Sequence, residues 1–178
     1  MAKLANRQPV LKPQDLLVLL ALLSHGDGPV TLPELAARTG LAVSAVHASL
    51  KRAATARLLL FQERRPVLLK PQLKEFLLAG AKYAFPPLFA SLSRGVPTSY
   101  AAAPLNTIIA PTGDPVPVWP SAKGSARGIA LMPLYPTVPD AALRDEKLYA
   151  MLSLFDAIRA GQARERNAAQ DLLAGYFA

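Results

Sequence analysis

Apolar side chains recur at helical spacing near both ends of this chain, and a stretch of different pattern separates the two regions. Val46, Leu50 and Ala53 stand at positions i, i+4 and i+7, which predicts one buried stripe along a helix. The same spacing returns later in the chain, in Leu148, Met151, Leu152, Phe155 and Ile158. We therefore expect a mainly α-helical protein.

The segment from Pro13 to Ser24 is apolar on nearly every side. Pro13 suits the first turn of a helix, and Asp15 lies favourably near its positive end. The run is far shorter than the roughly 20 residues that span a bilayer. Because such a helix must be covered all round, we expect it either at the centre of its domain or shared with a second subunit.

Two short helical patterns follow, joined by a turn. Thr31 is a suitable cap for the first helix, and Glu34, three residues later, completes the pattern of a capping box. Gly40 ends this helix, because glycine tolerates the positive φ of a tight C-terminal cap. The second helix is predicted over residues 43–54. Together the two predict a helix-turn-helix.

The second helix carries small, polar and basic side chains opposite its buried stripe. At about 100° per residue, this face consists of Ser44, Ala48, Lys51 and Thr55, flanked by Ala45, His47 and Arg52. A helix that enters a DNA major groove needs this combination, since bulky side chains would hold it away from the base edges and cations must meet the phosphates.

A β-hairpin is predicted directly after the second helix. Leu58–Phe61 and Val67–Leu69 are short, strand-like apolar runs, and residues 62–66 between them form a basic tip. The short Val30–Thr31 segment is a candidate third strand. This order of helices and hairpin is that of a winged helix.

From Val30 to Lys70 the chain resembles the winged helix-turn-helix domains of bacterial transcriptional regulators, and the motif LPELAARTGLAVSAVHASLKR looks most like those of the MarR type. In that family the second helix enters the major groove and the wing reaches the backbone or the minor groove. The resemblance therefore implies that double-stranded DNA is bound by Ser44, Ala45, His47, Ala48, Lys51 and Arg52, with Arg64 and Arg65 on the wing. We expect a sequence-specific regulator that acts as a repressor; the alternative is a winged-helix module that binds other proteins.

The distribution of charge agrees with an anionic partner. The net charge is +8, and residues 1–82 hold twelve Lys or Arg against five acids. The excess of cations therefore lies with the winged helix. Clustered cations favour a polyanion because they release condensed counterions from phosphate. The alternative is a basic surface that serves solubility.

The composition changes after residue 82, which suggests three regions. Residues 1–82 form the predicted DNA-binding domain, ending in a short helix from Pro71 to Leu78. Residues 83–139 carry eleven of the seventeen prolines between Pro86 and Pro139, yet many large apolar residues, so we expect an ordered, mostly irregular strap. The corresponding region of MarR-type proteins is mainly helical. Because this segment differs, the resemblance does not predict a ligand pocket, and a small-molecule effector stays unknown.

Residues 140–178 are predicted to form two helices, which either pack on the core or pair with a second copy. The first should end at Gly161, and the second ends in an apolar stripe of Leu172, Leu173, Tyr176 and Phe177. This stripe and the apolar helix near the N-terminus predict a homodimer. In the alternative, the strap covers both helices within one chain.

Catalytic and metal-binding patterns are missing from the sequence. It has no cysteine, no Gly-x-Ser-x-Gly motif, and only two histidines, His25 and His47. We therefore expect neither an enzyme nor a cofactor. The N-terminus lacks the arrangement of a secretory signal, which fits a cytoplasmic protein.

Overall fold

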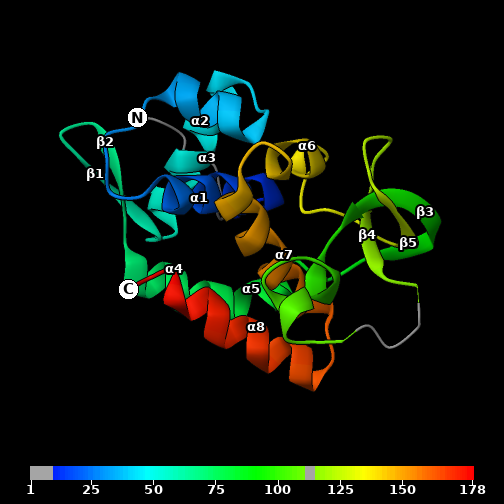
Figure 1. Ribbon diagram of the computed structural model, residues 1–178. Coiled ribbons are helices and arrows are strands. Elements are labelled where there is room, and N and C mark those ends of the chain that lie inside the picture. The colour runs from blue at the N-terminus through cyan, green and yellow to red at the C-terminus, as the bar shows by residue number, and fades with distance from the viewer. Residues whose placement is uncertain (1–9, 111–114) are drawn as a thin grey trace.

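The computed structural model describes residues 10–110 and 115–178. It is mainly helical with a small two-stranded antiparallel sheet beside a helix-turn-helix, which confirms the predicted fold class (Figure 1). Lys3 and Arg7, which contribute to the predicted basic charge, lie outside the described residues. No helix within the described ranges is both long and apolar enough to cross a membrane.

Helix α1 (Pro13–His25) precedes the helix-turn-helix, which consists of α2 (Leu32–Thr39) and α3 (Val43–Thr55). Capping residues set both ends of α2. The hydroxyl of Thr31 accepts the Glu34 N–H at 3.3 Å, and the Glu34 carboxylate accepts the Thr31 N–H at 2.7 Å. These bonds confirm the capping box and lower the pKa of Glu34. Gly40 follows with φ of 70°, the left-handed conformation predicted for it.

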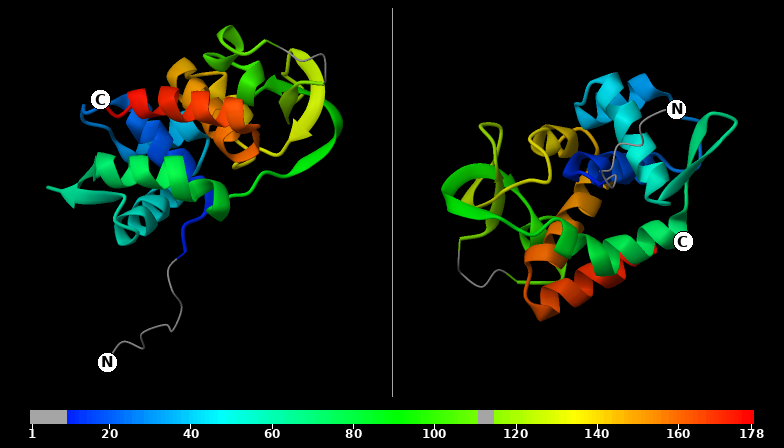
Figure 2. Two further views of the ribbon diagram at one scale, coloured as in Figure 1. Left: turned by 90° about the horizontal axis from the view of Figure 1, so that it is seen from below. Right: turned by 180° about the vertical axis from the view of Figure 1, so that it is seen from behind.

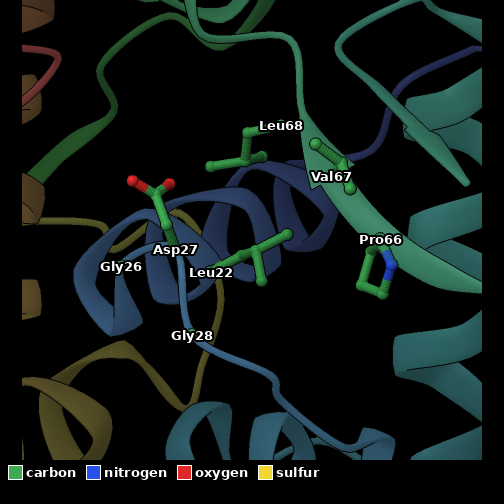
Figure 3. Close-up of a pocket in the computed structure, with 7 residues that line it drawn as sticks. All are labelled: Leu22, Gly26, Asp27, Gly28, Pro66, Val67 and Leu68. Atoms are coloured by element: carbon green, nitrogen blue, oxygen red, sulfur yellow. The ribbon is translucent and has the colours of Figure 1, made fainter. Parts of the chain in front are cut away.

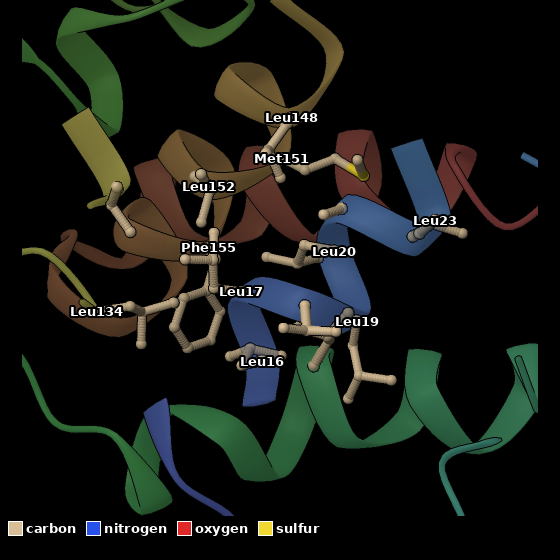
Figure 4. Close-up of a cluster of buried hydrophobic side chains, with 14 of the residues drawn as sticks. Leu16, Leu17, Leu19, Leu20, Leu23, Leu134, Leu148, Met151, Leu152 and Phe155 are labelled. Carbon is tan, nitrogen blue, oxygen red and sulfur yellow. The ribbon is translucent and has the colours of Figure 1, made fainter. Parts of the chain in front are cut away.

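Helix α1 occupies the centre of the molecule. Every residue from Asp15 to Ser24 is buried. Helices α2 and α3 pack on α1, and α7 (Glu146–Ala160) covers it from another side. Figure 4 shows the facing side chains of α1 and α7, which include Leu17, Leu20, Met151 and Phe155. The apolar surface of α1 is therefore covered within one chain, and it does not require a second subunit.

The wing is a hairpin of β1 (Leu59–Gln62) and β2 (Arg65–Leu68), paired in antiparallel register. The candidate third strand at Val30–Thr31 does not form. Instead, a cavity of about 290 Å³ separates β2 from the loop of residues 26–28, and Figure 3 shows the side chains around it. The physical reason lies at Thr31, the cap of α2, because its N–H donates to the Glu34 carboxylate at 2.7 Å and is not available to a strand ladder.

The helix after the wing is longer than predicted. It runs through α4 (Lys70–Glu75), a π-helical segment (Phe76–Gly80) and α5 (Ala81–Ala84). Gly80 does not end it, because its φ of −95° and ψ of −37° remain helical. Helix α8 (Ala163–Gly175) lies beside it, and the side-chain amide of Gln170 donates to the carbonyl of Leu78 at 2.8 Å (Figure 2).

The proline-rich region contains more regular structure than the predicted strap. Strands β3 (Phe89–Pro97), β4 (Pro117–Pro120) and β5 (Ala126–Leu131) pair with one another in a small closed sheet. Two short 3₁₀ turns, Ser99–Ala101 and Leu105–Thr107, follow β3. The prolines of β3 and β4 stand at strand ends, where a missing N–H costs little.

A buried carboxylate joins this sheet to α7. Asp156 accepts hydrogen bonds from the Trp119 indole at 2.6 Å, the Thr98 hydroxyl at 2.8 Å and the Arg159 guanidinium at 2.7 Å. Helix α6 (Val138–Ala142) then leads from the sheet into α7, which ends before Gly161 as predicted.

Candidate nucleic-acid interface

The exposed face of α3 is formed by the residues that the sequence pattern indicates. Ser44, His47 and Lys51 are exposed, while Ala45 and Ala48 are half-buried beside them. On the opposite face Val46 and Leu50 are fully buried against the core. Burial of this stripe fixes the rotation of α3, so that its small and basic side chains point to solvent.

The tip of the wing is a two-residue turn with left-handed backbone at both positions. Glu63 has φ of 49° and Arg64 has φ of 65°, as in the type I′ turn whose twist matches a hairpin. The turn joins Gln62 to Arg65, which are paired across the strands. As a result Arg64 and Arg65 are held at the exposed end of the wing, close to α3.

A groove of about 570 Å³ lies between α3, the wing and the start of α2. Its cationic and polar lining comes from Lys51, His47, Arg64, Arg65 and Thr31. Its apolar lining comes from Val30, Leu32, Phe61 and Pro66. The fold therefore brings the basic residues of the helix and of the wing to one concave surface.

Lys51, Arg64 and Arg65 have no carboxylate partner within the described part of the chain. Their charges are therefore available to an external anion. Glu63 beside them is the single acid of the hairpin tip. A concave surface with several uncompensated cations attracts a polyanion, and this attraction weakens as salt screens it.

Arg52 is bound to a carboxylate within the chain. Its guanidinium donates to both oxygens of Asp15, at 2.8 Å and 2.6 Å, and also to the Ser49 hydroxyl at 3.2 Å. Asp15 is fully buried, and its hydrogen bond with Arg52 raises the pKa of Arg52. Arg52 therefore ties α3 to the first turn of α1, and its phosphate contact stays a prediction.

A second ion pair links the helix-turn-helix to the C-terminal helices. Arg38 at the end of α2 binds Asp145 at 2.5 Å, and Asp145 also caps α7 through the Leu148 N–H at 3.0 Å. Nearby, the Thr137 hydroxyl donates to the carbonyl of Thr39 at 2.7 Å. The turn before α3 is thus held by residues of the C-terminal region.

Sequence reasoning missed two residues of this region. Asp15 was expected to interact only with the helix dipole, and nothing in the sequence pairs it with Arg52, which is 37 positions away. Phe61 was assigned to a strand, yet it lines the groove. Strand alternation puts Phe61 on the same face as the buried Leu59, so the sequence pattern alone does not indicate that Phe61 is open to a groove.

The fold and this surface define a winged helix-turn-helix DNA-binding domain. Residues 16–59, about a quarter of the chain, match the model of the IclR helix-turn-helix domain. Comparison with curated proteins and with solved structures gives no match. The match supports a bacterial helix-turn-helix transcription regulator that binds double-stranded DNA, a class that is generally not enzymatic. It points to the IclR type instead of the MarR type.

Replacing Arg52 with alanine tests its role as a tie between helices. The change leaves the buried Asp15 carboxylate without its cationic partner, and we expect the free energy of unfolding to fall by about 3 kcal/mol. Urea denaturation followed by circular dichroism measures this loss. The neighbouring Lys51→Ala is the matched control, because Lys51 is exposed and should change stability by less than about 0.5 kcal/mol.

Salt provides the second readout of the same prediction. Because Asp15 is fully buried, the destabilisation by Arg52→Ala should persist in 1 M NaCl, whereas a surface pair would be screened. Equal stabilities of the Arg52 and Lys51 variants would show that the ion pair does not hold α3.

Proposed function

We propose that this chain is a sequence-specific, double-stranded DNA-binding transcription regulator that acts as a repressor in the cytoplasm. The observation that carries the proposal is the groove between α3 and the wing, where Lys51, Arg64 and Arg65 gather without carboxylate partners in the described residues. In this proposal α3 enters the major groove and the wing contacts the backbone. Residues 1–82 supply the DNA contacts, and the rest of the chain supports them.

Base readout is proposed for the start of α3. The Ser44 hydroxyl can donate or accept, the Ala45 methyl can touch a thymine methyl, and His47 can donate to a purine acceptor. Ala48 is small enough to let the helix approach the base edges. None of these side chains makes the bidentate contacts of Arg or Asn, so most of the affinity should come from phosphates.

The phosphate contacts are tested by the double change Arg64→Ala, Arg65→Ala. We expect weaker binding to every duplex, and a plot of log Kd against log salt whose slope is flatter by about two units, one for each lost contact. Fluorescence anisotropy with a labelled duplex at several salt concentrations measures both quantities.

Arg164→Ala is the control, because Arg164 is exposed on α8. This variant should keep the parent affinity and slope. If the wing variant also keeps both, the wing is not a phosphate contact. If the parent protein binds no duplex at low salt, the winged helix serves as a protein-interaction module.

His47→Ala tests sequence readout. Selection from a random duplex library should return a consensus that differs from the parent consensus at one position, because a single base contact is lost. An unchanged consensus would remove His47 from the readout.

In vitro transcription tests the repressor role. A promoter that overlaps the parent consensus should give less transcript when the protein is added, and more transcript would make the protein an activator.

We also propose a homodimer, because two recognition helices about 34 Å apart read successive turns of one DNA face. The support differs from what the sequence suggested, since α1 is covered within one chain and Leu173 of α8 is buried. It comes from Leu88, just before β3, and from Phe89 and Leu92 in the first half of that strand, which are 64%, 54% and 52% exposed. Exposed apolar clusters of this kind generally mark interfaces.

Light scattering at micromolar concentration tests the homodimer. We expect twice the chain mass of 19.0 kDa, and the change Phe89→Ser, Leu92→Ser should shift the mass toward a single chain. Leu143→Ser is the control, because Leu143 is similarly exposed at 50% but lies after α6. A parent mass of one chain would contradict the dimer, and an unaffected dimer in the β3 variant would place its interface elsewhere.

A further inference from the structure

Phe61 stands out in the groove between α3 and the wing because it is the one aromatic phenyl ring among lining residues that include Lys51, Arg64 and Arg65. It is 44% exposed, and its partner across the hairpin is Pro66. Leu59, two residues earlier, is 1% exposed and points to the core. Since alternate residues of a strand share a face, Phe61 lies on the inner face of the wing, toward α3.

Leu60 offers a direct comparison. It is 41% exposed, which is close to the exposure of Phe61, but it belongs to the outer face of the hairpin. Leu60 does not line the groove, whereas Phe61 does. The two residues therefore separate a general effect of apolar side chains on the wing from an effect inside the groove.

The lining of the groove combines apolar and cationic side chains. Phe61, Pro66 and Leu32 supply apolar surface, and Lys51, Arg64 and Arg65 supply positive charge. A free inorganic anion would use the cationic side chains alone. A DNA strand matches both parts, because it alternates charged phosphates with deoxyribose rings whose C–H groups are apolar.

We propose that this groove holds one sugar–phosphate strand of the duplex, with the Phe61 ring packed against a deoxyribose. The inference rests on the proposed function and adds a contact that is neither ionic nor specific for a base. The cations bring the strand to the groove, and burial of Phe61 then adds affinity that salt does not screen. Phe61 thus differs from the arginines of the wing in that its contribution to affinity does not depend on salt.

The change Phe61→Ala should shift the plot of log Kd against log salt without changing its slope. Phe61→Ala should weaken binding about tenfold at every salt concentration, because the lost contact buries apolar surface. The slope of log Kd against log salt should stay at its parent value. The loss should be the same for a selected duplex and for an unrelated one, since deoxyribose is common to all sequences.

The experiment compares Phe61→Ala, Leu60→Ala and Arg65→Ala with the parent chain, each checked by thermal melting followed with circular dichroism. Leu60→Ala should bind as the parent does, and Arg65→Ala should flatten the salt slope. Weakened binding by Arg65→Ala together with unchanged binding by Phe61→Ala would overturn the inference and leave the proposed function standing. Failure of every variant to alter binding would instead defeat the proposed function.

Two further outcomes would also overturn the inference. A flatter salt slope in Phe61→Ala would mean that the ring only positions the arginines of the wing. A changed consensus after selection would mean that the ring touches a base.

Fluorescence gives an independent test that does not depend on a loss of affinity. The parent chain has one tryptophan, Trp119, which is 1% exposed. It belongs to β4, which lies on the opposite side of the molecule from the wing (Figure 1). Phe61→Trp adds a reporter in the groove, and its emission should change when a saturating duplex is added. Leu143→Trp places a reporter of similar exposure, 50%, outside the groove and outside the proposed dimer interface, and its emission should not change. Equal responses from the two variants would contradict a strand seated in the groove.

Discussion

The structure depends on the need to cover an apolar helix on all its faces. Helix α1 has no polar side apart from its ends, so water must be excluded from it in every direction. Helices α2 and α3 cover one side, and α7 covers another. Helices α3 and α7 are therefore positioned against the same element, which gives the basic face of α3 a rigid support.

Ion pairs fix the orientation that apolar packing leaves adjustable. Apolar contacts tolerate small rotations of a helix, whereas a bidentate contact such as Arg52 to Asp15 allows one arrangement. Arg38 with Asp145, and Arg159 with Asp156, add one hydrogen bond each at other junctions. The pairs of Arg52 and Arg38 join residues that are distant in the sequence. The pair of Arg159 with Asp156 is local, but Arg159 also donates to the backbone carbonyls of Phe85, Pro86 and Met132.

The proposed interface depends on which cations are paired with carboxylates inside the protein and which are not. Net charge alone does not distinguish a cation that is neutralised inside the protein from one that faces solvent. Arg52 and Arg38 are paired with carboxylates, while Arg64, Arg65 and Lys51 border an open groove. The second group is the one that an external phosphate can use, and its members come from two separate elements.

Local signals in the sequence determined the helix-turn-helix and the wing. Thr31, Glu34 and Gly40 set helix ends through contacts within a few residues, and the spacing of Val46 and Leu50 set the buried face of α3. Tertiary structure alone decided the pairing of Arg52 with Asp15, the groove around Phe61 and the strands in the proline-rich region. These features depend on side chains or strands that meet only after the chain has folded, and a pattern confined to neighbouring residues carries no information about such partners.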